Sequence, residues 1–515
     1  MFYNFFSKQR LVYGLAILAI ALIANIFCNR YSPLLNAQLE PDPAIFYMTG
    51  KALVHGMTPY VDFADVKGPL LPVIYAIGYI LTPDKQFGCF VVLTILSAVT
   101  LLYIFKTARA LNLSKPMALL ASGLSMYAIF APGYGGGRAE DILHPFMAML
   151  ICYIVVYLKQ SLSDNEPNLT NSLKKAGWAC GICVSAALLI KFNNMTPAAL
   201  ASVMIAFNEW KNKRFKSYFS YFVTRFLAGF LILTLPFIIW LSALGCLDDC
   251  IDVYFVVNYQ STRGGFLIGT AYDTIFRLYA NITQTSNAIP VLACAALLIP
   301  GFFNTIKSDL TERLMLLIVL VITYLSNSIY HGSYFIHASA PFFCVAAITI
   351  VRYIRPLKGK SLFFIIPVLT FFIISLNGVW KGRCYKRFTE KESEQLQQIT
   401  AELSKVKNPK IIYHTWLDFG LGMKAGDLPA CKYWLVHNGL GDICRNNQKK
   451  AIIQRIPDFV ICFTRPGSPA PKDPADYSEC IEETAFLLEN GYHHVASYNI
   501  KKMDTIVLFK RNEDY

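Results

Sequence analysis

Acidic and basic side chains gather in two short stretches of an otherwise apolar chain. The first, EPDPAIFYMTGKALVHGMTPYVDFADVKGPLL, covers residues 40–71 and is too irregular for a helix and too charged for lipid, so we expect a loop. The second, GYGGGRAED, covers residues 133–141. Ionisable groups at a lipid boundary are costly and usually functional, so the two stretches are predicted to form the halves of one catalytic site. Their ionisable members, with the histidine that follows, are Glu40, Asp42, Lys51, His55, Asp62, Asp65, Lys67, Arg138, Glu140, Asp141 and His144.

Composition decides the solvent in which this chain folds. Of its 515 residues 55% are hydrophobic and only 16% are charged, whereas a soluble domain carries about 25% charged residues. A transmembrane helix needs roughly 20 apolar residues, and about eleven runs approach that length. We therefore predict an α-helical polytopic membrane protein with about 11 transmembrane helices. The runs are 11–28, 86–105, 116–131, 142–158, 176–190, 198–209, 219–243, 284–303, 314–329, 337–351 and 362–380.

The lysine and arginine residues between these runs indicate orientation, because cytoplasmic connections carry an excess of both. They occupy alternate connections, provided that residues 69–82 (PLLPVIYAIGYILT) form a short helix at the membrane surface and not a span. The first run, 11–28, is expected to remain as an uncleaved span, because no small-residue cleavage site follows it. The net charge of +14 is then explained mainly by the cytoplasmic side and needs no nucleic acid. The predicted extracytoplasmic segments are 29–85, 132–141, 244–282, 330–336 and the C-terminal tail.

The last segment, residues 381–515, changes character. Charged residues, Asn and Pro become common, and short apolar runs alternate with helical periodicity at 390–406 and 480–490. We therefore predict a membrane domain over residues 1–380 and a small C-terminal extracytoplasmic α/β domain over residues 381–515. The runs expected to form its strands are 410–413, 458–463, 494–498 and 505–509.

Fourteen cysteines carry little functional information. Those in the apolar runs act as small apolar residues, and Cys180-x-x-Cys183 has the spacing of a redox or metal pair but lies inside such a run. In the C-terminal region a disulfide between Cys431 and Cys444 is possible in an oxidising compartment, as is one involving Cys462 or Cys480. A phosphate-binding P-loop, a dinucleotide fingerprint, a zinc-spaced His/Cys cluster and a nucleophile elbow are all absent. No soluble nucleotide cofactor is indicated.

Four motifs in a fixed order resemble those of the GT-C glycosyltransferases. They are PYVDFADVKGPL in the first stretch, RAED at the start of the fourth span, an isolated Lys191 after the fifth, and YHGSYFIHASAP late in the chain. The pattern is similar to that of the bacterial family-39 membrane enzymes, which are akin to protein O-mannosyltransferases and the lipid A aminoarabinose transferase. It covers about residues 1–380, with segment 29–85 as the catalytic external loop.

The resemblance implies an inverting transfer of a sugar from a polyprenyl-phosphate carrier to an acceptor hydroxyl on the periplasmic face of the inner membrane. The acceptor would be a cell-envelope glycan, a lipid or a protein. A hydroxyl that attacks the sugar needs a base, which a carboxylate supplies. The leaving phosphate needs a fixed cation and no general acid. Nucleotide sugars are not found on that side of the membrane, which agrees with the missing nucleotide motifs.

Roles follow from the resemblance position by position. Asp42 is the expected base, Asp65 and Lys67 form an acid–lysine pair with Lys67 on the carrier phosphate, and Arg138 with Glu140 comes from the second stretch. Pro43 departs from the pattern, since many relatives have a second acid there. Either Glu40 replaces that acid or one acid suffices. The remaining candidates are Lys191 for the donor phosphate and Tyr60, Asp62, Asp141, His331, Tyr334 and His337 for the substrates.

Each candidate also has a structural interpretation. Asp42 could cap a helix that begins near Ala44, Asp62 could serve a turn after Pro59-Tyr60, and Lys67 could reach lipid headgroups with its ammonium group. Arg138 and Glu140 could pair at a helix start. Lys191 could reach the headgroups in the same way as Lys67. His331, Tyr334 and His337 are of types common at membrane interfaces, and Trp416, Asp418 and Trp434 of the C-terminal region could contact sugar or form a small core.

Other classes of membrane protein stay open at this stage. A transporter or flippase should show internal repeats and charges at mid-membrane depth, and neither is seen here. An O-antigen polymerase or ligase would carry its functional arginines in a large late loop, whereas the dense loop here is the first. The acids could hold a divalent metal ion, but Lys67 would compensate the same charge and the resemblance is to metal-free members. We predict no metal and no cofactor.

Overall fold

The computed structural model describes residues 8–34, 41–130, 136–161, 166–258, 390–414, 427–436, 441–463, 481–499 and 505–513, together with Pro341, Cys344, Val345 and Ile348. Its chain divides into two compact units. The first unit comprises Met1–Leu34, Val91–Ile238 and Gly264–Tyr385, and the second comprises Leu35–Phe90, Ile239–Arg263 and Lys386–Tyr515. The second unit thus joins the first polar stretch to the C-terminal region. The boundary predicted between residues 380 and 381 stays a prediction.

The first unit is built from long apolar helices, as the composition predicts. Its described helices are α1 (Lys8–Cys28), α4 (Phe87–Ala110), α5 (Lys115–Phe130), α6 (Ala139–Ser161), α7 (Glu166–Ile190), α8 (Thr196–Lys211), α9 (Phe215–Ser217), the π-helix η2 (Tyr218–Val223) and α10 (Thr224–Ala243), with the 3-10 turn η1 (Phe192–Met195) after α7. Five helical stretches in the described ranges are long and apolar enough to cross a bilayer. The chain is therefore a polytopic α-helical membrane protein, as predicted.

The first seven predicted runs all fall on these helices. Runs 116–131 and 198–209 correspond to α5 and α8, which have 16 residues each and are shorter than a typical span. The last four runs, from residue 284 onwards, lie outside the described residues, apart from single positions of run 337–351. The number of 11 helices therefore stays a prediction.

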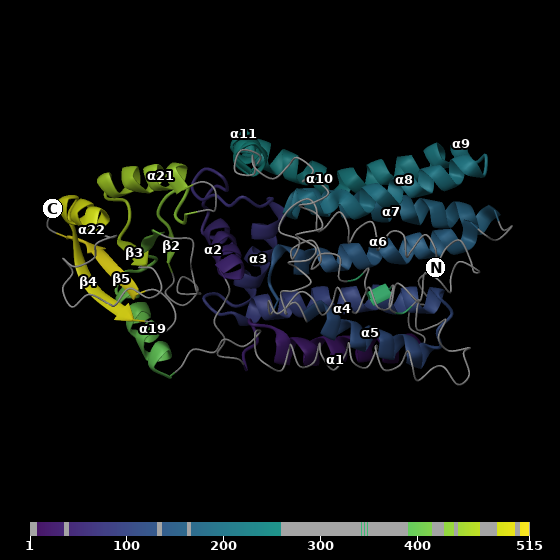
Figure 1. Cartoon of the computed structure of the whole chain (residues 1–515), viewed down its shortest axis with the longest axis horizontal. Helices are drawn as coiled ribbons and strands as arrows, with labels where there is room; N and C mark the ends of the chain where they lie inside the picture. Colours follow the sequence, from purple (N-terminus) through teal and green to yellow (C-terminus); the bar gives the residue numbers. More distant parts are fainter. Residues whose placement is uncertain are drawn as a thin grey trace, which may run out of the picture. The chain divides into compact units, whose positions relative to one another are not determined.

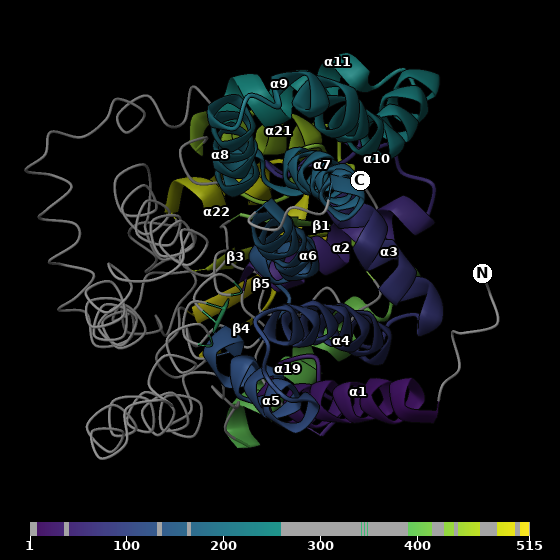
Figure 2. The same cartoon turned by 90° about the vertical axis from the view of Figure 1, so that its right-hand side faces the viewer.

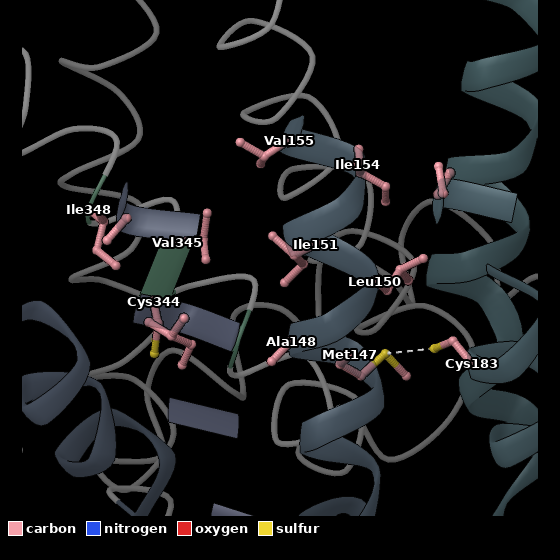
Figure 3. Packing of buried hydrophobic residues seen from close by; sticks show 14 of the residues in the cluster. Met147, Ala148, Leu150, Ile151, Ile154, Val155, Cys183, Cys344, Val345 and Ile348 are labelled. Carbon is pink, nitrogen blue, oxygen red and sulfur yellow. Dashed lines mark hydrogen bonds between the residues drawn. The ribbon is translucent and has the colours of Figure 1, made fainter. Parts of the chain in front are cut away.

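Helix α6 forms the centre of the first unit. It lies between α7 and α4 (Figures 1 and 2), and Met147, Ile151 and Ile154 are among its buried side chains. Figure 3 shows Met147 directed toward Cys183 of α7, whose thiol donates to the Met147 sulfur at 3.8 Å. Cys180 and Cys183 are both free and buried. The Cys-x-x-Cys spacing therefore serves helix packing here.

Helix α7 packs closely on the chain of η2 and α10. A Cβ atom added at Gly177 would lie 2.5 Å from the Phe222 carbonyl oxygen, and one at Gly181 would lie 2.1 Å from the Phe226 carbonyl oxygen. Small residues at such contacts let transmembrane helices approach until their backbones touch. This packing holds the middle of α7 directly against η2 and α10.

The second unit contains a helix where the sequence predicts a loop. Helix α2 spans Pro41–Val54 and packs on α3, Leu70–Leu81. The expectation that residues 40–71 are too irregular for a helix is therefore wrong for their first half. Pro41 opens the helix, where a proline is tolerated, and good helix formers such as Met48, Ala52 and Leu53 follow it. At Gly50 an added Cβ would lie 2.6 Å from the Ala76 nitrogen, so only glycine permits this approach.

The short helix predicted over residues 69–82 is confirmed as α3, and its place at the membrane surface stays a prediction. Two further short elements of the second unit follow α10. They are α11, Leu247–Ile251, and the π-helix η3, Asp252–Val257.

The C-terminal part of the second unit forms the predicted small α/β structure. Its elements are α19 (Glu390–Leu403), β1 (Lys410–Tyr413), β2 (Leu428–Pro429), α21 (Gly441–Ile453), β3 (Phe459–Phe463), α22 (Ile481–Glu489), β4 (Tyr492–Asn499) and β5 (Thr505–Arg511). The strand order is β2-β1-β3-β5-β4. Strand β1 is parallel to both of its neighbours, whereas β5 is antiparallel to both of its own. Figure 1 shows these strands with α19, α21 and α22 around them.

All four predicted strands of this region are present, and helices occupy both predicted helical segments. Helix α21 and strand β2 were not predicted. No disulfide joins Cys431, Cys444 or Cys462 to another described cysteine, so the disulfide considered for Cys431 and Cys444 is not formed. Trp434 is fully buried, which supports the core interpretation for this residue. Cys480, Trp416 and Asp418 lie outside the described residues.

Candidate active site

Asp42, the predicted base, lies in the first turn of α2 and is half-buried. A carboxylate is favoured there because the first turn of a helix presents unpaired backbone N–H groups and the positive end of the helix dipole. The helix begins at Pro41, so Asp42 lies within its first turn and the cap of a helix that begins near Ala44 is excluded. Glu40 lies outside the described residues.

The loop that follows α2 is organised around Tyr60. Its side chain is buried, and its backbone adopts φ 64°, a left-handed conformation that is unusual for an aromatic residue. The Tyr60 hydroxyl donates to the Lys67 carbonyl oxygen at 2.8 Å, and the Tyr60 N–H donates to the Phe63 carbonyl oxygen at 2.7 Å. Burial raises the pKa of Tyr60 well above its usual value, so the phenol keeps its proton.

Asp62 is exposed and takes part in the turn. Its carboxylate accepts the Thr58 N–H at 2.7 Å, while its own N–H donates to the Thr58 carbonyl oxygen at 2.9 Å. This is the turn role that the sequence offered as the alternative for Asp62. A direct contact between Asp62 and a substrate stays a prediction.

Asp65 and Lys67 are half-buried in a segment held by residues far away in the sequence. The Ala64 N–H donates to the Lys432 carbonyl oxygen at 2.7 Å. The Asn258 side-chain amide donates to the Val66 carbonyl oxygen at 2.8 Å. Together with the bond from Tyr60, these contacts fix the backbone on both sides of Asp65.

Lys51 is the ionisable residue of α2 whose surroundings the sequence did not reveal. It is fully buried, and its ammonium nitrogen lies 3.2 Å from a carboxylate oxygen of Asp84. The C-terminal Asp427 is also fully buried and accepts the Tyr413 hydroxyl at 3.1 Å. Desolvation raises the pKa of Asp427 to about 6, although the positive charge of Lys51 acts in the opposite direction.

The second predicted stretch forms the start of α6 in the first unit. The Asp141 carboxylate accepts the Arg138 backbone N–H at 2.9 Å, as an acid at the third helical position does in a capping box. Glu140 is buried, and its carboxylate accepts the Lys191 ammonium group at 2.5 Å. Lys191 is thus a partner of Glu140, which neither the phosphate interpretation nor the headgroup interpretation anticipated. Arg138 is buried as well.

A cavity of about 20 Å³, lined by both polar and apolar side chains, opens beside this helix start. Its polar lining comes from α1 and the turn after it, from α4 and from α6, and consists of Asn25, Asn29, Ser97, Thr100, Asp141 and His144. A space of this size holds about one water molecule. Gly136 lies at its wall with φ +81°, and an added Cβ would come within 3.3 Å of the Asn29 side chain. The cavity therefore gathers hydrogen-bonding groups next to Asp141.

Sequence reasoning missed Asn25 of α1 and Asn29, which directly follows this helix. The Asn29 amide donates to the Asn25 side-chain oxygen at 2.8 Å, and the Asn25 amide donates to the Ala21 carbonyl oxygen at 2.9 Å. A signal was present, because polar residues four apart at the end of an apolar run lie on one helix face and are costly in lipid. Asn258 and Lys432 had no comparable signal.

The predicted site residues therefore lie in two groups within the described chain. Asp42, Tyr60, Asp62, Asp65 and Lys67 belong to the second unit. Arg138, Glu140, Asp141 and Lys191 belong to the first unit. His331, Tyr334 and His337 lie outside the described residues.

The described residues form no cluster of metal-ligating side chains. No three His, Cys, Asp or Glu side chains of these segments come together in a way that could hold a metal ion. The absence of a metal requirement stays a prediction.

Comparison with known structures identifies proteins that share this fold. No protein-family model and no curated protein sequence matches the chain. The crystal structure of ArnT from Cupriavidus metallidurans bound to undecaprenyl phosphate matches with a TM-score of 0.63 at 11% identity, over 99% of this chain and 99% of that one. The apo structure of ArnT matches with a TM-score of 0.60 at 11% identity, over 97% and 98% of the two chains. ArnT is a GT-C glycosyltransferase, so the predicted GT-C fold is confirmed.

Proposed function

We propose that the protein is an inverting glycosyltransferase that takes a sugar from a polyprenyl-phosphate-linked donor. The acceptor is a hydroxyl of a cell-envelope glycan, lipid or protein, and the reaction takes place on the periplasmic face of the inner membrane. The observation that carries this proposal is the fold shared with ArnT over nearly the whole length of both chains. That ArnT structure holds undecaprenyl phosphate, which is a polyprenyl phosphate.

A shared fold alone does not establish a shared reaction, so the proposal also needs groups suited to the chemistry. A half-buried carboxylate, Asp42, takes the proton from the attacking acceptor hydroxyl. The hydroxyl oxygen forms the new bond to the sugar carbon from the side opposite the phosphate, so the configuration at that carbon inverts. The bond to the carrier breaks at the same time, and the electron pair leaves with the polyprenyl phosphate.

Cations then stabilise the phosphate that departs. Lys67, with a backbone fixed by three hydrogen bonds in its segment, is the proposed ligand from the second unit. Arg138 stays a candidate phosphate ligand from the sequence resemblance, since a guanidinium group can hold two phosphate oxygens at once. Lys191 has a buried carboxylate partner, Glu140, so we assign it to holding this region together more than to the phosphate itself.

The transfer assay uses the full-length protein purified into nanodiscs. Radiolabelled undecaprenyl-phosphate sugars are supplied together with a membrane extract that contains acceptors, and the label that moves off the lipid is counted. We expect transfer by the wild type and a loss of about 100-fold or more in Asp42→Asn, the usual scale for removal of a general base. Lys67→Ala should weaken donor use by a comparable factor.

Matched controls show whether these losses are specific. Asp442 also lies in the first turn of a helix, α21, and is exposed, so Asp442→Asn should keep wild-type transfer. Lys85 is an exposed lysine of the same unit, so Lys85→Ala should do the same. Full activity of both Asp42→Asn and Lys67→Ala would refute the site. If no lipid-linked sugar were consumed while a solute or an intact lipid-linked sugar crossed the membrane, the transporter or flippase alternative would replace this proposal.

A further inference from the structure

The loop that carries Lys67 contains a buried tyrosine, Tyr60, whose own backbone conformation is strained. Tyr60 is only 3% exposed, and its φ of 64° places a bulky aromatic residue in the left-handed region. Such a conformation is unfavourable and persists only where the surrounding structure enforces it, often at functional sites. The gain at this position is a hydrogen bond from the Tyr60 hydroxyl to the Lys67 carbonyl oxygen at 2.8 Å.

Asn258 holds the neighbouring carbonyl group from another part of the second unit. Its side-chain amide donates to the Val66 carbonyl oxygen at 2.8 Å and to the Tyr254 carbonyl oxygen at 2.7 Å. Both of its N–H donors are thereby used. The asparagine directly follows the π-helix η3. Helices of this type are rare in proteins overall, and those that occur are often found at functional sites.

The C-terminal region supplies the third contact. Lys432 accepts the Ala64 N–H with its carbonyl oxygen at 2.7 Å. Its ammonium group donates to a carboxylate oxygen of Asp249 in α11 at 2.7 Å. Two carbonyl groups and one N–H group between Ala64 and Lys67 are therefore held by Tyr60, Asn258 and Lys432.

A residue binds phosphate more tightly when its backbone is already ordered before the phosphate arrives, because no entropy is then lost on ordering it. A lysine side chain is flexible and offers a point charge, so its reach is defined only as well as its Cα atom is fixed. The three contacts act on the backbone around Lys67 and thereby fix the position of its Cα atom. Because Tyr60 is buried, this arrangement gives it a role that needs no contact with substrate.

We infer that Tyr60 and Asn258 are positioning residues that hold Lys67 in place for the phosphate of the lipid-linked donor, with Lys432 of the C-terminal region completing the clamp. The inference rests on the proposed function, because it takes Lys67 as a phosphate ligand. It also gives the C-terminal region, through Lys432, a task in the binding of the donor phosphate.

The first experiment measures the affinity of the full-length protein for undecaprenyl phosphate in nanodiscs. Tyr60→Phe removes one hydroxyl group, and Asn258→Asp replaces the donor to Val66 with an acceptor. We expect each variant to bind about 5- to 10-fold more weakly than the wild type, the scale of one lost hydrogen bond. In a Lys67→Ala background neither change should weaken binding further, because the residue that they position is gone.

The matched control is Tyr492→Phe. Tyr492 is another buried tyrosine of the second unit, and its hydroxyl donates to the Pro457 carbonyl oxygen at 2.9 Å. This variant loses the same kind of bond far along the chain from Lys67, so its affinity for undecaprenyl phosphate should equal that of the wild type. An equal loss in Tyr60→Phe and Tyr492→Phe, or a further loss from Tyr60→Phe in the Lys67→Ala background, would overturn the inference.

A second measurement separates this inference from the proposed function. Hydrogen exchange of the backbone amides of residues 64–67 needs no ligand, and we expect it to be about 5-fold faster or more in Tyr60→Phe and Asn258→Asp than in the wild type. If these amides respond as expected but the wild-type protein does not bind undecaprenyl phosphate, the proposed function is refuted. The inference that Tyr60 and Asn258 hold the backbone around Lys67 would still stand. Unchanged exchange of these amides in both variants would refute the inference that Tyr60 and Asn258 hold this backbone, whatever the affinity for undecaprenyl phosphate.

Discussion

Lys191 and Lys51 are both withdrawn from solvent, one in each unit, yet their surroundings differ. The Lys191 side chain is 18% exposed and makes a direct contact of 2.5 Å with the buried Glu140. The Lys51 side chain is 1% exposed, and its nearest described carboxylate, Asp84 at 3.2 Å, is 47% exposed. A second acid, Asp427, is fully buried near Lys51 and has one carboxylate oxygen without a hydrogen-bond partner in the described chain.

The difference shows that burial does not by itself decide whether a charge stabilises a fold. The attraction within a buried ion pair in direct contact offsets much of the cost of desolvating its charges. Loss of one partner leaves the other charge buried without compensation. A buried acid whose oxygens are only partly satisfied keeps a net cost, which appears as the raised pKa of Asp427. The two regions should therefore respond with opposite sign when a charge is removed.

The largest change in stability is expected from Lys191→Met, because this variant leaves the buried Glu140 carboxylate without the ammonium group of Lys191. Loss of one partner of a buried pair costs about 3–5 kcal/mol, so the apparent unfolding temperature of the full chain in detergent should fall clearly. The double variant Lys191→Met/Glu140→Leu, which removes both charges, should recover most of the loss. A single variant as stable as the wild type would mean that the pair contributes nothing.

Asp427→Asn should stabilise the protein at neutral pH. The folded-state pKa of Asp427, about 6, lies above the ordinary value of 3.8, so its stabilising contribution is complete below about pH 4 and is lost as the pH rises through about 6. Asparagine mimics the protonated form, and we expect a gain of roughly 2–3 kcal/mol at pH 7.5 that disappears near pH 4. Thermal unfolding at both pH values measures it.

Asp458→Asn is the control for Asp427. Asp458 accepts from Arg511 at 2.6 Å in the same C-terminal region, so its neutralisation should not stabilise the protein at pH 7.5. A loss of stability in Asp427→Asn at pH 7.5 would show that the attraction to Lys51 outweighs the cost of desolvation, which would remove the contrast between the two regions.

Tyr413→Phe sharpens the comparison by making Asp427 still less satisfied. The variant removes the hydroxyl that donates to the Asp427 carboxylate at 3.1 Å, and a hydrogen bond to a charged group is worth about 1.5–3 kcal/mol. We expect a loss near the lower end of this range at pH 7.5 and a smaller loss at pH 5, where Asp427 is mostly protonated. Equal losses at the two pH values would contradict the assignment to the charged carboxylate.

The smallest effect is expected for an exposed pair. Lys405 lies 2.6 Å from Glu402 at the end of α19, but its side chain is 62% exposed. Surface pairs of this kind contribute about 0–1 kcal/mol, so Lys405→Ala should change the unfolding free energy by less than about 0.5 kcal/mol. A change as large as that of Lys191→Met would show that contact distance outweighs burial.

Much of the fold could be predicted because it depends on local patterns. Long apolar runs require helices in a bilayer, and the alternating short runs of the C-terminal region correspond to the strands of the sheet. The error at α2 has a local cause as well. Its charged and polar residues, Asp42, Thr49 and Lys51, hide a helix because two of them, Thr49 and Lys51, are buried and do not form an exposed polar face.

Partners in the site could not be predicted, because no local pattern encodes them. Lys191 and Glu140 are 51 residues apart, and Asn258 and Val66 are 192 residues apart. Which carboxylate a buried lysine meets, and which carbonyl an asparagine holds, depends on how helices pack in three dimensions. The sequence therefore indicates which residues are candidates for the site, but not which partners those residues contact.

The hydrogen bond between Ala64 and Lys432 also has a consequence for biosynthesis. At about 5–20 residues per second, the ribosome reaches Lys432 on the order of 20 to 70 seconds after Ala64. During that interval the loop around Lys67 lacks one of its three holding contacts. A chain still under synthesis, or one truncated before Lys432, therefore has every predicted apolar run already made but lacks one of the contacts that hold the loop around Lys67.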